Sequence, residues 1–293
     1  MIKYCFFALT LLLLSCQSNQ KKEKDTLTVT IEPQRFFLEE IVGDKFSVKT
    51  LVPPGSSPET YEPAPSAMVN LGNSKLYFKV GFLGYENAWS DKLKANNPDV
   101  KIIDCSEGIE LIYGEHHHDH DNGHSHEHEG EAVDPHVWSS PKNALKFSQN
   151  MLDAVIEMDK ENADFYRVNF EKLSEKIRQT DATIASMLDT VSNRSFIIYH
   201  PALSYFANDY GLHQHSIEFE GKNPSPAQMR NLIDLSEKEN IQVVFIQQEF
   251  DKKNAEVIAK EIGAESFTIN PLAYEWDKEL MRIAKILSGQ INE

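Results

Sequence analysis

Histidine is the residue type whose placement first suggests chemistry in this chain of 293 residues. Seven of the eleven histidines lie in residues 116–128, where they alternate with acids. Imidazole nitrogen and carboxylate oxygen are ligands for zinc and related divalent ions. These seven residues are His116, His117, His118, His120, His124, His126 and His128. We expect residues 114–131 to form a polar loop that collects zinc, the alternative being a solvated, dispensable insert.

A second group of polar residues stands apart from the histidine-rich loop. Most of them follow segments that read as buried strands, and one lies in the short stretch "DPHVW". In open α/β sheets, ligands bind at the carboxyl ends of the strands. The group consists of Glu59, His136, His200, Gln247, Glu249 and Asn270. We therefore predict a four-ligand cage between two lobes, suited to zinc or another first-row divalent ion.

The three cysteines restrict the kind of metal site. Residues 1–15 carry one lysine and an apolar run, which is the layout of a secretory signal. The stretch "LLSC" resembles a bacterial lipobox and implies a lipid on Cys16, followed by a polar tether over residues 16–25; an ordinary signal with an incidental cysteine is the alternative. Only Cys105 then remains, so neither an internal disulfide nor a thiolate zinc cluster can form.

The charge and the absent motifs exclude several classes of function. A formal net charge of −16 repels nucleic acid and anionic lipid and attracts cations. The chain has no GxxxxGK[ST] phosphate loop, no HExxH and no GxSxG. Any ATPase that works with this protein must therefore be a separate polypeptide.

Alternating strand and helix patterns indicate the elements that position these residues. "LTVTI", "FSVKTLV", "KLYFKVG" and "VKIIDCS" read as strands with helical patterns between them, and the pattern resumes at "SFIIYH". Such alternation predicts parallel sheets covered by helices. Residues 161–191 show one uninterrupted helical periodicity, with Phe165 and Leu173 among the residues of its apolar face. Ser225 is a candidate N-cap of a later helix. We predict an α/β protein with lobes over 26–158 and 193–293, joined by a long rigid helix over 159–192.

Longer motifs then make the chain recognisable. "LVPPGSSPETYEPAPSAM", "DPHVWSSPKNA" and "YHPALSYFANDYGL" resemble segments of the metal-specific substrate-binding lipoproteins of ABC importers, the zinc/manganese family that includes ZnuA-type proteins. The resemblance covers essentially the whole mature chain. It implies two α/β lobes linked by a long helix, with one divalent metal in the cleft between them.

The resemblance also implies a set of metal ligands, with two departures from the family pattern. His136 and His200 match ligand histidines, Glu59 stands where a histidine is usual, and Asn270 stands where many members have aspartate. A neutral amide is a poor zinc ligand, so the fourth position stays open. The alternatives to Asn270 are Glu218, Glu220, Glu249 and Glu275. We expect zinc, with manganese or iron(II) as alternatives because oxygen donors favour them.

The implied function is capture and delivery of the metal. We expect an extracytoplasmic monomer, in the periplasm or at the cell surface, that is anchored to the membrane through acylated Cys16. It would deliver its ion to an ABC permease powered by a separate ATPase, and it would not be an enzyme. Two rival interpretations are a secreted zinc hydrolase and a zinc-buffering or adhesin lipoprotein.

Overall fold

The computed structural model describes residues 24–113, 133–218, 222–250 and 252–291. The predicted signal, Cys16, most of the tether and the whole histidine-rich loop (residues 114–131) lie outside these ranges, as does Glu220. Within the described ranges, no helix has the length and apolar character needed to cross a membrane.

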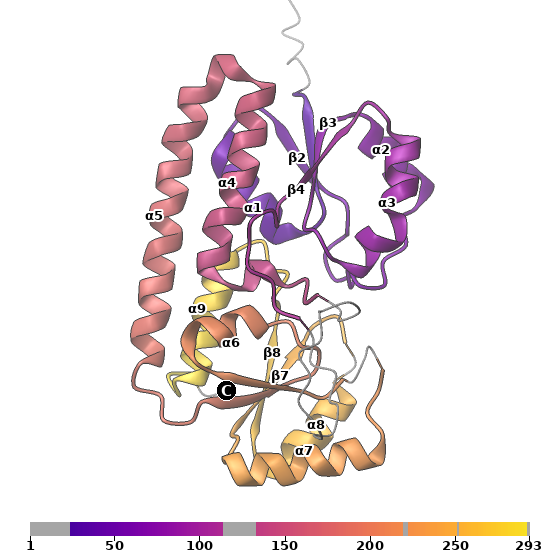
Figure 1. Cartoon of the computed structure of the whole chain (residues 1–293). Helices are drawn as coiled ribbons and strands as arrows, with labels where there is room; N and C mark the ends of the chain where they lie inside the picture. The colour runs from indigo at the N-terminus through magenta and orange to yellow at the C-terminus, as the bar shows by residue number, and fades with distance from the viewer. Residues whose placement is uncertain (1–23, 114–132, 219–221, 251, 292–293) are drawn as a thin grey trace, which may run out of the picture.

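The N-terminal lobe is built on a parallel four-stranded sheet in the order β2-β1-β3-β4. Helices α1, α2 and α3 connect the strands and pack beside them (Figure 1). The strands are β1 (Thr26–Val29), β2 (Ser47–Thr50), β3 (Ser74–Lys79) and β4 (Lys101–Asp104), and the helices are α1 (Glu32–Val42), α2 (Pro65–Gly72) and α3 (Gly84–Asn96). The carboxyl ends of these parallel strands therefore share one edge of the sheet.

The C-terminal lobe repeats this plan with a parallel sheet in the order β6-β5-β7-β8. The central strand β7 is almost fully buried, as its apolar sequence predicts for a strand covered on both faces. The strands are β5 (Ser195–Ile198), β6 (His213–Ser216), β7 (Val243–Gln247) and β8 (Glu265–Ile269), and the helices are α6 (Ser204–Tyr210), α7 (Pro226–Glu239) and α8 (Lys253–Ile262).

One long helix runs alongside both lobes, and two shorter helices pack against it. Helices α4 (Pro141–Met158) and α5 (Ala163–Leu188) pack against each other, and α9 (Trp276–Leu287) returns from the C-terminal sheet to lie against α5 (Figure 1). Helix α5 has 26 residues, which corresponds to about 39 Å of length. The fold is therefore the predicted one, two α/β lobes of parallel sheet joined by a long helix.

Helix α5 begins later and ends earlier than the predicted span of 161–191. A 3₁₀ turn (Lys160–Asn162) precedes it, because the carboxylate of Asp159 accepts hydrogen bonds from Asn162 Nδ2 at 2.8 Å and from the Tyr166 hydroxyl at 2.6 Å. The side chain of Tyr166 is buried, whereas Phe165, which we placed on the apolar face, is 38% exposed. Tyr166 precedes Leu173 by seven residues, which is two turns and the same face; Phe165 is turned away from it by about 80°.

One hydrophobic core runs through both lobes and the connecting helices. It includes residues of β1, α1, α4, α5, β5, β7 and α9. Within it, Trp276 of α9 contacts the aromatic rings of Phe36 and Phe37 in α1 at centroid distances of 6.4 and 5.0 Å. Each of these fully buried side chains stabilises the fold by about 1.5–3 kcal/mol or more. The two lobes therefore share a core where they meet the helices.

Hydrogen bonds beside the cleft connect the part of the chain before α5 with the part after it. Trp138 Nε1 donates to the carbonyl oxygen of Pro271 at 2.9 Å, and Trp276 Nε1 donates to the carbonyl oxygen of Trp138 at 2.7 Å. Tyr205 of α6 donates to the carbonyl oxygen of Asp134 at 2.9 Å and accepts from the backbone N–H of Ile112 at 3.0 Å. Because these polar groups would be left without partners if the lobes separated, the segment leading to α4 is held firmly in place.

Candidate metal centre

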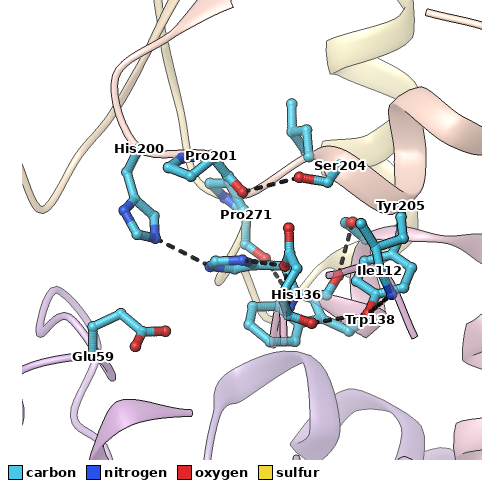
Figure 2. Close-up of polar contacts among 12 residues, drawn as sticks. Glu59, Ile112, His136, Trp138, His200, Pro201, Ser204, Tyr205 and Pro271 are labelled. Carbon is cyan, nitrogen blue, oxygen red and sulfur yellow. Dashed lines mark hydrogen bonds and ion pairs between the residues drawn. The ribbon is translucent and has the colours of Figure 1, made fainter. Parts of the chain in front are cut away.

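Three side chains from distant parts of the chain converge between the lobes. One oxygen of Glu59 and one ring nitrogen each of His136 and His200 all lie within 4.8 Å of one another. Figure 2 shows the carboxylate of Glu59 on one side and the two imidazoles on the other. Glu59 lies in the turns that follow β2, His136 directly precedes the 3₁₀ turn Val137–Ser139, and His200 follows β5. Three of the four predicted ligands are thus brought together.

The carboxylate of Glu59 is held by a backbone contact with the start of α3. Its Oε2 accepts a hydrogen bond from the N–H of Gly84 at 3.1 Å, and its Oε1 is buried with no hydrogen-bond partner among the described residues. A Cβ atom on Gly84 would lie 2.7 Å from the Glu59 carbonyl oxygen and 2.9 Å from Oε2. Glycine is therefore required there for the backbone to approach the carboxylate. The unpartnered Oε1 is available to a cation.

The imidazole of His136 is oriented by the carboxylate of Asp134. Asp134 Oδ1 lies 2.8 Å from His136 Nδ1 and also accepts from the His136 backbone N–H at 2.8 Å. Burial acts to lower the pKa of His136, but the nearby carboxylates, Asp134 above all, outweigh it and raise the pKa above its ordinary value. The same pair holds the pKa of Asp134 below its usual value, although burial alone would raise it. Asp134 therefore stays ionised and holds the ring in one orientation.

The imidazole of His200 is oriented by Glu218 in the same manner. Glu218 Oε2 lies 2.8 Å from His200 Nδ1. Gln247 holds the backbone on both sides, since its Nε2 donates to the carbonyl oxygen of His200 at 2.5 Å and its Oε1 accepts from the His200 N–H at 3.3 Å. The ring of Phe250 stacks on the imidazole with centroids 5.2 Å apart. His200 is therefore fixed in position by residues at the ends of β6 and β7.

These two carboxylate contacts decide which nitrogen of each ring faces the cleft with its lone pair. An ionised carboxylate only accepts hydrogen bonds, so each neutral imidazole carries its proton on Nδ1. Both Nε2 atoms are then acceptors, yet they point toward each other at 3.3 Å (Figure 2). Two facing lone pairs beside a carboxylate require a positive charge between them. A carboxylate–histidine pair of this kind is the usual support of a metal-bound imidazole.

The space between these side chains is small. The cavity has a volume of about 10 Å³, which is room for one ion or one water molecule and excludes an organic ligand. Its lining residues are Ser57, Pro58, Glu59, His136, Trp138, His200, Ala202, Glu249, Phe250, Pro271 and Leu272. The arrangement can hold a single cation with nitrogen and oxygen donors.

The residues considered for the fourth ligand occupy different environments. Asn270 does not line the cavity; its Oδ1 accepts from the Leu272 N–H at 3.2 Å and its own N–H donates to Glu279. Glu218 is engaged with His200, and Glu275 is exposed and paired with Lys278. Glu249 lines the cavity, and its Oε2 is buried with no hydrogen-bond partner in the part of the chain that the structure describes. Burial raises the pKa of Glu249, although the two histidines act to lower it.

Sequence reasoning missed two residues that support the site. Asp134 was not considered, although an acid two residues before a histidine in the rigid stretch "DPH" is a usable signal. Gly84 was not considered either, and no local pattern marks it, because its role depends on the approach of a loop 25 residues earlier. Glu218 was considered only as a ligand, whereas its carboxylate orients His200.

Comparison with known proteins identifies relatives of this chain. Residues 27–282 match the family described as "Zinc-uptake complex component A periplasmic" (ZnuA). The high-affinity zinc uptake system protein ZnuA of Bacillus subtilis is 30% identical over 259 residues, covering 87% of this chain and 81% of that protein. The manganese-binding lipoprotein MntA of Halalkalibacterium halodurans is 26% identical over 232 residues, covering 78% and 72%. A crystal structure of ZnuA superimposes with a TM-score of 0.83 at 34% identity, covering 91% of this chain and 99% of that one.

Proposed function

The chain belongs to the ZnuA family of metal-binding proteins from ABC uptake systems, and on that premise we propose that it captures zinc outside the cytoplasm and delivers it to a membrane permease. The family comprises transport proteins, not enzymes, so the zinc hydrolase considered above is excluded. Zinc is the cargo in this proposal. Manganese or iron(II) is the second candidate, favoured by the manganese-binding relative and by the carboxylate in the site.

The observation that carries the proposal is the pair of facing Nε2 atoms beside Glu59. Asp134 and Glu218 keep the protons on the far nitrogens, so His136 and His200 present two lone pairs to one point. Neutral imidazole nitrogen with carboxylate oxygen is a donor set that zinc binds well. Without the ion the site is negatively charged, and a bound divalent cation neutralises this charge. This charge balance supports capture of the metal at low concentration.

The rest of the proposal concerns parts of the chain outside the described residues. Cys16 carries the lipid that anchors the protein to the membrane, and the monomer docks on a permease whose energy comes from a separate ATPase. Residues 116–128 act as an auxiliary collector that raises the zinc concentration near the cleft. A relative named a zinc-binding lipoprotein supports both the anchoring and the cargo, and a relative named a manganese-binding lipoprotein supports the anchoring.

Calorimetry with zinc tests the binding site. The wild-type protein should show one tight site that survives deletion of residues 115–130. The double substitution of His136 and His200 by alanine should abolish it. Substitution of His213 and His215, two histidines of β6 outside the cavity, is the matched control and should leave the affinity unchanged. The assignment would be contradicted if deletion of residues 115–130 alone removed the tight site. It would also be contradicted if the tight site persisted in the variant that lacks His136 and His200.

Uptake and fractionation test the delivery and the anchor. Cells that lack their own copy of the protein should recover zinc accumulation with the wild-type gene and fail to do so with the double alanine variant. A Cys16→Ala variant should move from the membrane fraction to the soluble fraction while binding zinc normally. Membrane retention of that variant would refute the lipid anchor and leave the metal assignment intact.

A further inference from the structure

Glu249 is the residue in this cleft whose environment is least explained by folding alone. Its carboxylate lines the same cavity as Glu59, His136 and His200. Its Oε2 is buried and accepts no hydrogen bond from any described residue. Taking a carboxylate oxygen out of water without giving it a partner is costly, so such a group points to a missing cationic ligand. Oε1 of Glu59, another lining residue of this cavity, is likewise buried without a hydrogen-bond partner among the described residues.

In the chain, Glu249 lies between two residues that hold His200 in position. Gln247 binds the His200 backbone through both ends of its amide, and Phe250 stacks on the imidazole. The segment that follows β7 is therefore attached to the His200 side of the site. Glu249 lies outside the group of three whose ligand atoms approach within 4.8 Å. A rotation of its side chain toward the cavity would be needed for it to reach a shared ion.

Asn270 offers no comparable group. Its amide oxygen accepts from the Leu272 N–H, and it is not among the residues that line the cavity. Its backbone N–H donates to Glu279, which also binds Arg282, so the residue belongs to the turn between β8 and α9. A neutral amide oxygen that already accepts a hydrogen bond is a weak ligand for a divalent ion.

We propose that Glu249, and not Asn270, is the fourth ligand, and that it sets the metal preference of the site. This inference rests on the proposed function. Glu59, His136 and His200 form a preformed group of three, and the carboxylate of Glu249 turns onto the ion after it has entered. Each lobe then supplies one imidazole and one carboxylate, and the two carboxylates balance the charge of a divalent ion. The second oxygen donor extends the range of accepted ions from zinc toward manganese and iron(II).

Titration of metal-free protein with Zn²⁺ and, separately, with Mn²⁺ tests this assignment. Glu249→Gln keeps the size of the side chain and removes its charge. We expect it to weaken Zn²⁺ binding by at least about tenfold and Mn²⁺ binding by a larger factor, because manganese depends more on oxygen donors. Glu256→Gln, an exposed acid of α8, is the control for loss of one negative charge and should stay within about twofold of wild type.

Thermal unfolding distinguishes a ligand from a structural residue. The metal-free Glu249→Gln variant should unfold at the same temperature as wild type or higher, because it no longer buries an unpartnered charge. The increase in unfolding temperature on adding Zn²⁺ should be smaller than for wild type. A variant that is destabilised without metal, and whose stabilisation by Zn²⁺ equals that of wild type, would show a structural role and overturn the proposal.

Asn270→Ala separates the two assignments. We expect its Zn²⁺ affinity to match wild type. Loss of affinity in Asn270→Ala together with normal affinity in Glu249→Gln would make Asn270 the fourth ligand and refute this inference alone. The proposed function fails by a different result, namely tight binding that persists when His136 and His200 are both replaced by alanine.

Discussion

Glu59 and His136 reach the metal centre from the part of the chain before α5, whereas His200 and Glu249 reach it from the part after α5. The side chain of His136 is 7% exposed, and its partner Asp134 holds both its ring and its backbone N–H. The side chain of His200 is 17% exposed, and Glu218 holds only its ring. The first half of the site is the more tightly enclosed.

Each half includes a buried carboxylate oxygen without a hydrogen-bond partner among the described residues, Glu59 Oε1 in the first and Glu249 Oε2 in the second. Glu59 is fixed by Gly84 through its other oxygen and belongs to the group of three whose ligand atoms lie within 4.8 Å, whereas Glu249 lies outside that group. The comparison suggests that the first half is an anchor for the ion and that the second half closes over it. Affinity should therefore depend most on the first half, and entry and release should depend on the second.

Replacing either histidine by alanine should have the largest effect. One ligand of four corresponds to roughly a quarter of the binding free energy, so a loss of several-hundred-fold in Zn²⁺ affinity is expected for each. His136→Ala should be the more severe of the two, because the side chain of His136 is 7% exposed against 17% for His200, so its bond to the ion is better shielded from water. Competition titration against a chelator of known affinity measures this. Equal effects would remove the distinction between the halves.

Replacing the orienting carboxylates should have the next largest effect. Asp134→Asn and Glu218→Gln should each lower Zn²⁺ affinity by roughly 10–100-fold, because an amide no longer fixes the proton on Nδ1. Asp134→Asn should be the more damaging, since Asp134 also accepts from the His136 backbone. Exposed Asp164→Asn on α5 serves as the control. A wild-type affinity for Asp134→Asn would show that its contact with His136 has no role in binding.

Acidification should weaken metal binding, and His136 determines where the decline begins. Because its pKa is raised, a proton occupies the ring at a higher pH than in an ordinary histidine and competes with the ion. Zn²⁺ affinity should fall as the pH is lowered from 7.5, starting above the ordinary histidine pKa of about 6.5, and by about tenfold per pH unit for each proton displaced. Calorimetry from pH 7.5 to 5 measures this, and a flat profile would contradict the assignment.

The same raised pKa has an opposite consequence for the metal-free fold. Protonated His136 stabilises the folded state at a pH below its unfolded pKa of about 6.5, and this stabilisation is lost as the pH rises through the higher folded value. The unfolding temperature of metal-free wild type, relative to that of His136→Gln, should therefore be higher at pH 6 than at pH 8. The reverse trend would show that the Asp134 contact does not raise the basicity of His136.

Gly84→Ala should have the smallest effect, and it concerns only Glu59 in the first half of the metal site. The added methyl group would contact the Glu59 carbonyl oxygen and Oε2, so the carboxylate must move. We expect a loss of a few-fold to about tenfold in Zn²⁺ affinity. Gly72→Ala is the matched control, because its methyl group would meet the side chain of Asn97 and no lining residue. Similar losses of affinity in both variants would indicate that the methyl group disturbs the N-terminal lobe in general, and that displacement of Glu59 is not the cause.

Much of the architecture could be predicted from local patterns. The strand–helix alternation predicted two parallel-sheet lobes, and the uninterrupted periodicity before β5 predicted the long helix. Ser225 was predicted as a helix cap, and its Oγ does accept from the Gln228 N–H at 3.3 Å. These features depend on residues within one or two turns of each other, which is why sequence alone is sufficient for them.

The exact limits of α5 and the burial of Tyr166 in place of Phe165 were not predicted. They depend on Asp159 and on the phase of the helix against α1 and α4. A helical pattern in sequence leaves an uncertainty of one or two residues in phase, because neighbouring apolar residues compete for the same face.

For the metal centre, sequence determined which residue types were available: few thiols, several imidazoles, and acids near the ends of strands. Only the tertiary structure decided that His136 and His200, 64 residues apart, bring their Nε2 atoms to 3.3 Å. It also decided that Asp134 and Glu218 orient them and that Glu249 faces the cavity while Asn270 does not. The physical reason is that residues of separate lobes can share an ion only if their side chains point to the same place. The direction of each side chain is set by packing between elements that are distant in the chain.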